Sequence, residues 1–207
     1  MAALERSALT DLAQELGPDA PTVCEGWAVR DLLAHLVLRE RSPLALGTVV
    51  RPLSGPMERE RVRRSEGDFT ALVERLRSGP PRLSLFGLPG LDKLLNSTEF
   101  FIHHEDLRRA QPGWEPRPLP NGTQDALWRT VKGAGRFALT RVPVGVVAER
   151  SGTGDRLTLK GGSPAAVVRG EPAEVLLYVT GRREHALVEL LGREDAQSAL
   201  ASARLGL

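Results

Sequence analysis

The chain contains little of what several common kinds of functional site require. Cys24 is its only cysteine among 207 residues, so no disulfide can form within the chain and no CxxC metal site is present. No HExxH, GxGxxG or Walker motif occurs, which leaves zinc-protease chemistry and nucleotide binding without support in the sequence. Any metal site must therefore use nitrogen and oxygen ligands. Only four histidines are available for it: His35, His103, His104 and His185.

The composition is that of an ordinary globular protein. Charged residues make up 26% of the chain and hydrophobic residues 41%. The 28 basic and 26 acidic residues leave a net charge of +2, which is weak grounds for a nucleic-acid partner. No apolar run approaches a membrane span, and residues 1–16 have the pattern of an amphipathic helix rather than of a signal peptide. We therefore expect a soluble, cytoplasmic monomer or homodimer that binds neither nucleic acid nor membranes.

Helical periodicity dominates the first two thirds of the chain. Apolar residues recur at steps of three and four, and Gly or Pro ends each segment. Two stretches, 43–56 and 81–90, have no clear type. The pattern predicts helices over residues 4–16, 29–40, 57–77, 91–110 and 121–139.

The period changes near residue 140. Residues 142–150 and 155–160 are rich in β-branched side chains and are separated by turn residues, which predicts a hairpin. The segments that follow read in turn as a strand, a helix, a strand and a helix, over residues 165–170, 170–182, 185–192 and 194–205. We therefore predict an α+β protein with a helical domain over 1–140 and a small α+β domain over 141–207.

A carboxylate and an imidazole interrupt an apolar row on the predicted helix 91–110. Leu91, Leu95, Glu99, His103 and Leu107 recur at steps of four, so a helix stacks them on one face. A charged group on an apolar face is costly unless another group pairs with it or a metal binds it. The row therefore predicts that Glu99 and His103 point inward. The alternative is a Glu–His pair on the surface.

A second helix contributes a histidine with the same kind of spacing. His35 lies three residues after Leu32 and seven after Ala28, on the apolar side of the helix predicted over 29–40. Zinc and similar divalent ions accept imidazole nitrogen and carboxylate oxygen, and three protein ligands leave a position open for water or substrate. If the two helices pack together, His35, Glu99 and His103 form such a set. Taken alone, His35 is more often a hydrogen-bonded core histidine than a ligand.

For the other polar side chains near these three residues, the sequence favours structural or surface roles. His104 lies about 100° around the helix from His103, and we expect it beside the site or exposed. Asp106 lies three residues after His103 and could hydrogen-bond it and fix its tautomer; an ordinary ion pair on the same helix is the alternative. Cys24 has no activating group nearby in sequence, so we set it aside as a small buried cysteine. His185 suits a surface role.

Three segments resemble a known family. Residues 24–37 (CEGWAVRDLLAHLV) and 99–110 (EFFIHHEDLRRA) resemble the actinobacterial mycothiol-dependent maleylpyruvate isomerase group. That group belongs to the DinB-like superfamily of metal-binding four-helix bundles. Residues 170–182 (GEPAEVLLYVTGR) are similar to the end of the smaller α+β domain of the group.

The resemblance implies a fold, a metal and a thiol. It implies an amino-terminal DinB-like four-helix bundle followed by a small carboxy-terminal α+β domain, which in this chain is shorter than is usual for the group. It places the metal ligands on His35, Glu99 and His103, and implies a divalent metal, usually zinc, with mycothiol as the thiol cosubstrate. Arg182 matches the end of the third segment and could bind the carboxylate of a substrate, although capping of the preceding helix explains it equally well.

Several functions remain open at this point. The leading hypothesis is an enzyme that activates a low-molecular-weight thiol, as an isomerase if the thiol leaves again or as an S-transferase if it stays on a small electrophilic substrate. A metal-dependent hydrolase would need no thiol. A non-catalytic protein that binds a metal or small ligand is the third possibility, and a buried hydrogen-bond network without a metal is the fourth.

Overall fold

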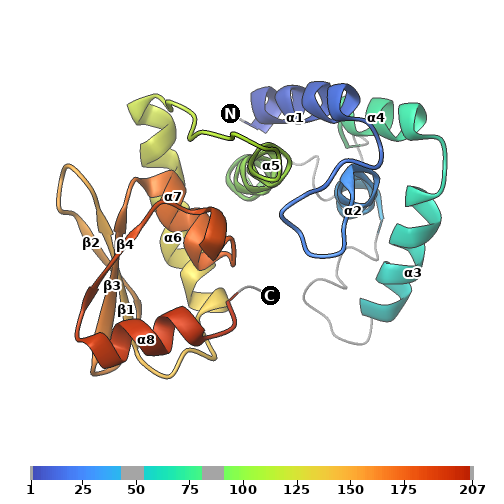
Figure 1. The fold of residues 1–207 in the computed structure, drawn as a ribbon. Coiled ribbons are helices and arrows are strands. Elements are labelled where there is room, and N and C mark those ends of the chain that lie inside the picture. Colours follow the sequence, from blue (N-terminus) through green and yellow to red (C-terminus); the bar gives the residue numbers. More distant parts are fainter. Residues whose placement is uncertain (1, 43–53, 81–90, 206–207) are drawn as a thin grey trace. The chain divides into compact units, whose positions relative to one another are not determined.

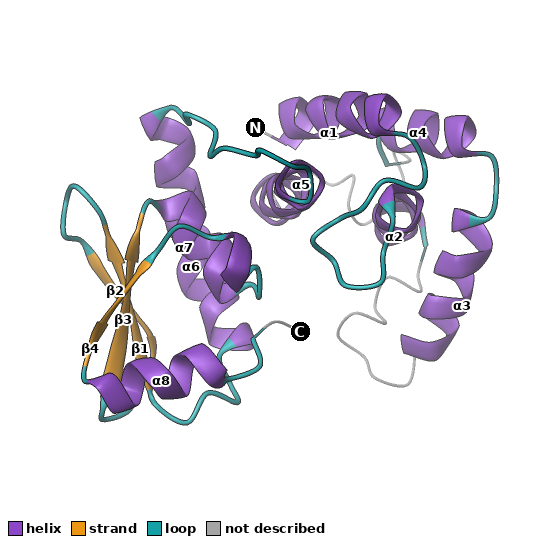
Figure 2. Ribbon diagram, in the orientation of Figure 1, coloured by secondary structure: helices purple, strands orange, loops and turns teal. Residues whose placement is uncertain are grey.

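The structure, a computed structural model, describes residues 2–42, 54–80 and 91–205. The chain divides into two compact units, Met1–Pro116 and Arg117–Leu207. The described part of the first unit is helical, and the second combines helices with one sheet (Figures 1 and 2). Most of segment 43–56 and all of segment 81–90, for which the sequence predicts no clear type, lie outside the described residues.

The first unit packs its helices around an apolar core. α1 packs on α5 and α4, and α2 packs on α3 and α4. The buried residues recur at helical spacing, which is why each helix has one face in the core. The fully buried members include Leu9, Leu33, Leu76, Phe100 and Leu107. The helices are α1 (Ala2–Leu16), α2 (Val29–Arg41), α3 (Ser54–Ser65), α4 (Phe69–Arg77) and α5 (Leu91–Arg109).

One helix prediction is wrong in this unit. The single helix expected over 57–77 is two helices, because the chain breaks between α3 and α4. Asp68 causes the restart: its side-chain Oδ1 accepts hydrogen bonds from the backbone N–H groups of Thr70 (2.8 Å) and Ala71 (3.2 Å). These are N–H groups that the first turn of a helix leaves without partners, so Asp68 caps α4.

The second unit contains a four-stranded sheet with the order β2-β1-β3-β4. β1 pairs antiparallel with β2 and parallel with β3, and β3 pairs antiparallel with β4. Each strand and helix expected after residue 140 is confirmed. The elements are α6 (Asn121–Ala138), β1 (Gly145–Arg150), β2 (Arg156–Lys160), β3 (Ala165–Gly170), α7 (Pro172–Val179), a short 3-10 turn η4 (Arg183–His185), β4 (Glu189–Gly192) and α8 (Glu194–Ser202).

The core of the second unit lies between its sheet and its helices. Alternate residues of β1, Val146 and Ala148, are fully buried, as a strand with one covered face requires. α6 packs on both α7 and β2. Gly135 allows this approach, because a Cβ at that position would lie only 3.0 Å from the side chain of Leu159. Gln124 on α6 accepts the backbone N–H of Ala173 and so ties α6 to the start of α7.

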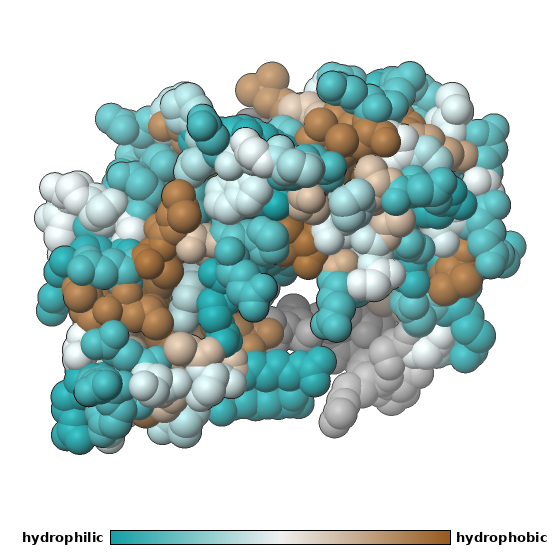
Figure 3. All heavy atoms as spheres, in the orientation of Figure 1, coloured by the Kyte–Doolittle hydropathy of each residue, from teal (hydrophilic) through white to brown (hydrophobic). Residues whose placement is uncertain are grey.

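The predicted class, a mixture of helices and sheet, is confirmed for the described residues, which hold eight α-helices and this sheet. The four-helix-bundle detail and a domain boundary at 140/141 stay predictions. In the structure α6 packs with the sheet, so the two compact units meet at residues 116 and 117. In the part of the chain that is described, no helix combines the length and the apolar character needed to cross a membrane. Hydrophilic side chains predominate on the visible face of each unit, with smaller apolar areas between them (Figure 3).

Candidate metal centre

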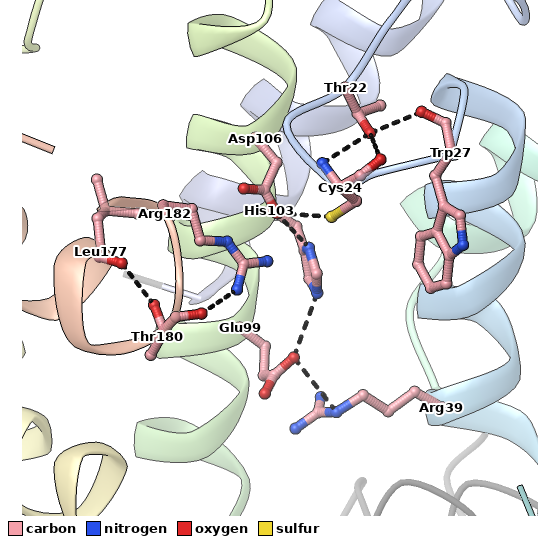
Figure 4. A network of polar contacts seen from close by, with 10 residues as sticks. All are labelled: Thr22, Cys24, Trp27, Arg39, Glu99, His103, Asp106, Leu177, Thr180 and Arg182. Carbon is pink, nitrogen blue, oxygen red and sulfur yellow. Dashed lines mark hydrogen bonds and ion pairs between the residues drawn. The ribbon is translucent and has the colours of Figure 1, made fainter. Parts of the chain in front are cut away.

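Two helices of the first unit bring the three predicted ligands together. His35 lies on α2, whereas Glu99 and His103 lie one turn apart on α5. One donor atom from each of the three side chains lies within 4.8 Å of the other two. The imidazole rings of His35 and His103 are 5.5 Å apart, edge to face. His103 Nε2 lies 3.5 Å from Glu99 Oε2 (Figure 4). The helix spacing read from the sequence thus corresponds to a cluster of two imidazoles and one carboxylate.

The start of α2 fixes the position of His35. Asp31 Oδ2 accepts the backbone N–H of Ala28 at 3.0 Å and so secures the first turn of the helix. The Trp27 ring, just before the helix, lies 5.2 Å from the His35 ring. The guanidinium of Arg61 stacks over that indole, 4.7 Å from its centroid. His35 is therefore held between the indole and the α5 residues.

The electrostatics leave His35 neutral and Glu99 ionised. Burial, the neighbouring His103 and the charges of Arg39 and Arg61 together lower the pKa of His35 to about 3. Burial by itself would raise the pKa of Glu99, but the hydrogen bond with His103 and the charge of Arg39, 3.8 Å away, outweigh it and lower that pKa to about 2. At neutral pH the pair offers a free imidazole lone pair and a carboxylate, which are the forms that bind a metal.

His103 lies between two carboxylates. Its Nδ1 is 2.9 Å from Asp106 Oδ2, and its Nε2 faces Glu99 (Figure 4). Burial alone would lower the pKa of His103, but hydrogen bonds with Asp106, Cys24 and Glu99 raise it well above 6.5. The ring is therefore protonated at neutral pH when no metal is bound, and a metal that binds at Nε2 has to displace a proton.

The structure describes only some side chains of the apolar row on α5. Leu107 is fully buried and His103 is 6% exposed, whereas the Glu99 side chain is 36% exposed. The side chains of Leu91 and Leu95 lie outside the described part of the structure. His104, expected beside the site or exposed, is as buried as His103. Its Nδ1 lies 2.9 Å from Glu5 Oε2 on α1, so it contacts a different carboxylate.

Sequence reasoning set Cys24 aside, and the structure places it at the site. Its Sγ lies 3.2 Å from Asp106 Oδ2, the same oxygen that contacts His103 (Figure 4). Cys24, His103 and Asp106 form a second group whose donor atoms lie within 4.8 Å of one another. No spacing rule could reveal this contact, because 82 residues separate Cys24 from Asp106. The hydrogen bond expected between Asp106 and His103 is present, and Arg109 pairs with Glu105 instead.

The remaining predicted residues lie in the second unit. Arg182 follows α7, where its backbone N–H donates to the carbonyl of Leu177 at 2.9 Å. Its Nη1 donates to the carbonyl of Thr180 at 2.7 Å (Figure 4). These contacts satisfy carbonyls at the end of the helix, as the capping alternative requires. His185 is half-buried in η4.

Comparison with known proteins places the chain in a family. A family model described as the mycothiol maleylpyruvate isomerase N-terminal domain matches residues 2–142. The chain belongs to this family. Membership of the mycothiol maleylpyruvate isomerase family indicates an isomerase enzyme, and the resemblance seen in the sequence is confirmed.

Solved structures show the same fold over nearly the whole chain. The crystal structure of the mycothiol-dependent maleylpyruvate isomerase is 18% identical to this chain, with a TM-score of 0.61. It is matched over 91% of this chain and 89% of its own. The crystal structure of a histidine-to-alanine mutant of that isomerase is 17% identical, with the same TM-score and coverage. No curated protein matches the chain.

Proposed function

We propose that this protein is a metal-dependent isomerase that uses a low-molecular-weight thiol, mycothiol, to isomerise a small electrophilic substrate of the maleylpyruvate type. The metal is held by His35, Glu99 and His103, and zinc is the first candidate. One observation carries the proposal: in a chain of this family, the three donors converge to within 4.8 Å from two separate helices. The enzyme acts in the cytoplasm, where thiols are kept reduced, as a monomer or homodimer.

The residues fit a divalent metal. The Nδ1 atom of His35 is buried and has no hydrogen-bond partner within residues 2–42, 54–80 and 91–205. A buried polar nitrogen without a partner is costly, and a metal or a ligand that binds this atom would remove that cost. Two imidazoles and a carboxylate suit zinc and leave a coordination position for another molecule. Nickel, iron and manganese accept the same donors, so metal analysis has to decide between them.

The protein's own groups prepare this site. When bound, the metal would lower the pKa of a coordinating thiol and so supply a thiolate near neutral pH. Asp106 holds a proton on His103 Nδ1, which turns Nε2 toward Glu99 and His35. Arg39 offsets the charge of Glu99. Trp27 covers one side of His35 with an apolar surface.

The proposal is tested with purified protein, maleylpyruvate and mycothiol, after metal analysis. We expect bound divalent metal, and substrate loss that requires both metal and thiol while the thiol concentration stays constant. Substrate loss no faster than without protein would overturn the isomerase reading. Stoichiometric thiol consumption would indicate an S-transferase, and turnover without thiol would indicate a hydrolase. His35→Ala serves as the control for the site: metal content equal to that of the unmodified protein would remove the proposed ligand set.

We further propose that Arg182 binds a carboxylate of the substrate. A guanidinium forms two parallel hydrogen bonds with a carboxylate, whereas a lysine ammonium acts as a point charge. We therefore expect Arg182→Ala to raise KM strongly and Arg182→Lys to recover part of the loss. If both variants keep the KM of the unmodified enzyme, Arg182 only caps α7.

A further inference from the structure

One carboxylate oxygen of α5 has two neighbours from distant parts of the chain. Asp106 Oδ2 lies 2.9 Å from His103 Nδ1 and 3.2 Å from Cys24 Sγ. Asp106 is fully buried. An ionised carboxylate can only accept hydrogen bonds. With Asp106 ionised, both contacts are satisfied together only if His103 carries a proton on Nδ1 and Cys24 is a thiol that donates its S–H.

The same aspartate also anchors the loop that carries Cys24. The backbone carbonyl of Asp106 accepts the N–H of Val23 at 3.0 Å. The loop is closed on itself by Thr22, whose Oγ1 donates to the carbonyl of Trp27 at 2.8 Å and accepts the N–H of Cys24 at 3.2 Å. Asp106 thus holds the loop through one backbone hydrogen bond and one side-chain hydrogen bond. The loop leads directly into α2, the helix that carries His35.

We propose that Cys24 is a positioning residue whose thiol donates to Asp106 and so helps to hold His103 with its proton on Nδ1 and its Nε2 toward Glu99 and His35. The proton placement follows from these two contacts with an ionised Asp106. Its consequence for metal binding rests on the proposed function. Cys24 lies where the loop before α2 contacts α5. Its contact with Asp106 therefore helps to fix the position of α2, which carries His35, relative to α5, which carries Glu99 and His103.

A rival reading makes Cys24 a ligand or a nucleophile, because Cys24, His103 and Asp106 by themselves form a candidate metal group. The contacts favour the donor role. A thiolate 3.2 Å from the Asp106 carboxylate would place two negative charges side by side. In addition, a metal at Nδ1 would have to break the 2.9 Å contact between His103 and Asp106.

The experiment compares full-length unmodified protein with Cys24→Ala and Cys24→Ser, each loaded with Co²⁺. The serine keeps a hydrogen-bond donor and the alanine does not, so the serine variant is the matched control. Groups that hydrogen-bond a ligand histidine typically contribute 10- to 100-fold in metal affinity. A thiol is a weak hydrogen-bond donor, so we expect Cys24→Ala to weaken Co²⁺ binding by less than that, about three- to tenfold. Cys24→Ser should stay within about twofold of the unmodified protein.

Spectroscopy separates positioning from ligation. We expect the Co²⁺ spectrum of the unmodified protein to lack a sulfur-to-cobalt charge-transfer band; a band that disappears in Cys24→Ser would make Cys24 a ligand and overturn the proposal. Equal Co²⁺ affinity in all three proteins would also overturn it. We expect ¹⁵N NMR to show a proton on His103 Nδ1 in both metal-free and zinc-loaded protein, and an unprotonated Nδ1 would contradict the proposal even if Cys24→Ala failed to fold. Failure of the unmodified protein to bind Co²⁺ would refute the proposed function, while the NMR result on metal-free protein would still decide the proton placement.

Discussion

Zinc binding should release one proton per ion, from His103, over a pH range in which the other two ligands do not titrate. The pKa values of His35 and Glu99 are about 3 and about 2, so both are already deprotonated above about pH 5. The pKa of His103 lies well above 6.5, because its hydrogen bonds with Asp106, Cys24 and Glu99 outweigh the effect of burial. The metal-free site therefore holds one proton that the metal must displace.

The sign and the size of the effect follow from this proton count. The proton is present in the metal-free state and absent in the bound state, so affinity rises with pH until the pKa of His103 is passed, and then levels off. One displaced proton makes affinity rise tenfold per pH unit, which corresponds to about 1.4 kcal/mol. If both histidines instead had the usual pKa of about 6.5, close to two protons would be released at about pH 5 and the rise there would approach 100-fold per unit.

Calorimetry in buffers with different ionisation enthalpies measures the proton release directly, and competition with a chelator measures the affinity. Measurements between about pH 5 and 6.5 cover the range in which the two accounts differ most. His104→Gln is the matched control, because His104 is equally buried on α5 but contacts Glu5, and this variant should release the same one proton. Release of two protons at about pH 5, or of none at about pH 6.5, would refute the ionisation states described for the three ligands.

Three further substitutions test separate contacts. Asp106→Asn should lower zinc affinity 10- to 100-fold without loss of helical content, because an amide no longer requires a proton on His103 Nδ1; an unchanged chelator titration would argue against that role. His104→Ala removes the 2.9 Å contact between His104 and the buried Glu5 carboxylate and should lower the free energy of unfolding in urea by about 1–3 kcal/mol, with zinc affinity unchanged. Asp68→Ala removes the cap of α4 and should cost about 1 kcal/mol in the same assay; no change would mean that the break between α3 and α4 has another cause.

The parts of the structure that sequence predicts well are those that depend on one element at a time. The period of four that joins Glu99 to His103 is a property of a single helix, and the structure places both beside His35. The strands after residue 140 follow from β-branched segments between turn residues, which are equally local signals. The break before Asp68 was missed although a capping residue stands at that position, because the apolar spacing on either side of it continues as if the helix were whole.

Contacts between elements far apart in the sequence cannot be predicted in this way. Cys24 looks inert beside its neighbours in the chain, since the group that gives it a partner lies on α5. Thr22 closes the loop before α2, and Val23 and Cys24 of the same loop contact Asp106. Such a contact depends on the packing of two helices and a loop together, so neither composition nor spacing in the sequence can indicate it.

The choice between His103 and His104 shows which part of the sequence argument carried weight. Burial does not separate them, because both are 6% exposed, and a carboxylate near Nδ1 does not either, because Asp106 and Glu5 supply one to each. What separates them is the helix that each ring faces. His103 faces α2, where His35 supplies a second imidazole, whereas His104 faces α1, where Glu5 is its described partner. The apolar row at steps of four residues was informative because it indicated the direction in which the His103 side chain points from α5. That direction decides which neighbouring helix can supply the other ligands of a metal site.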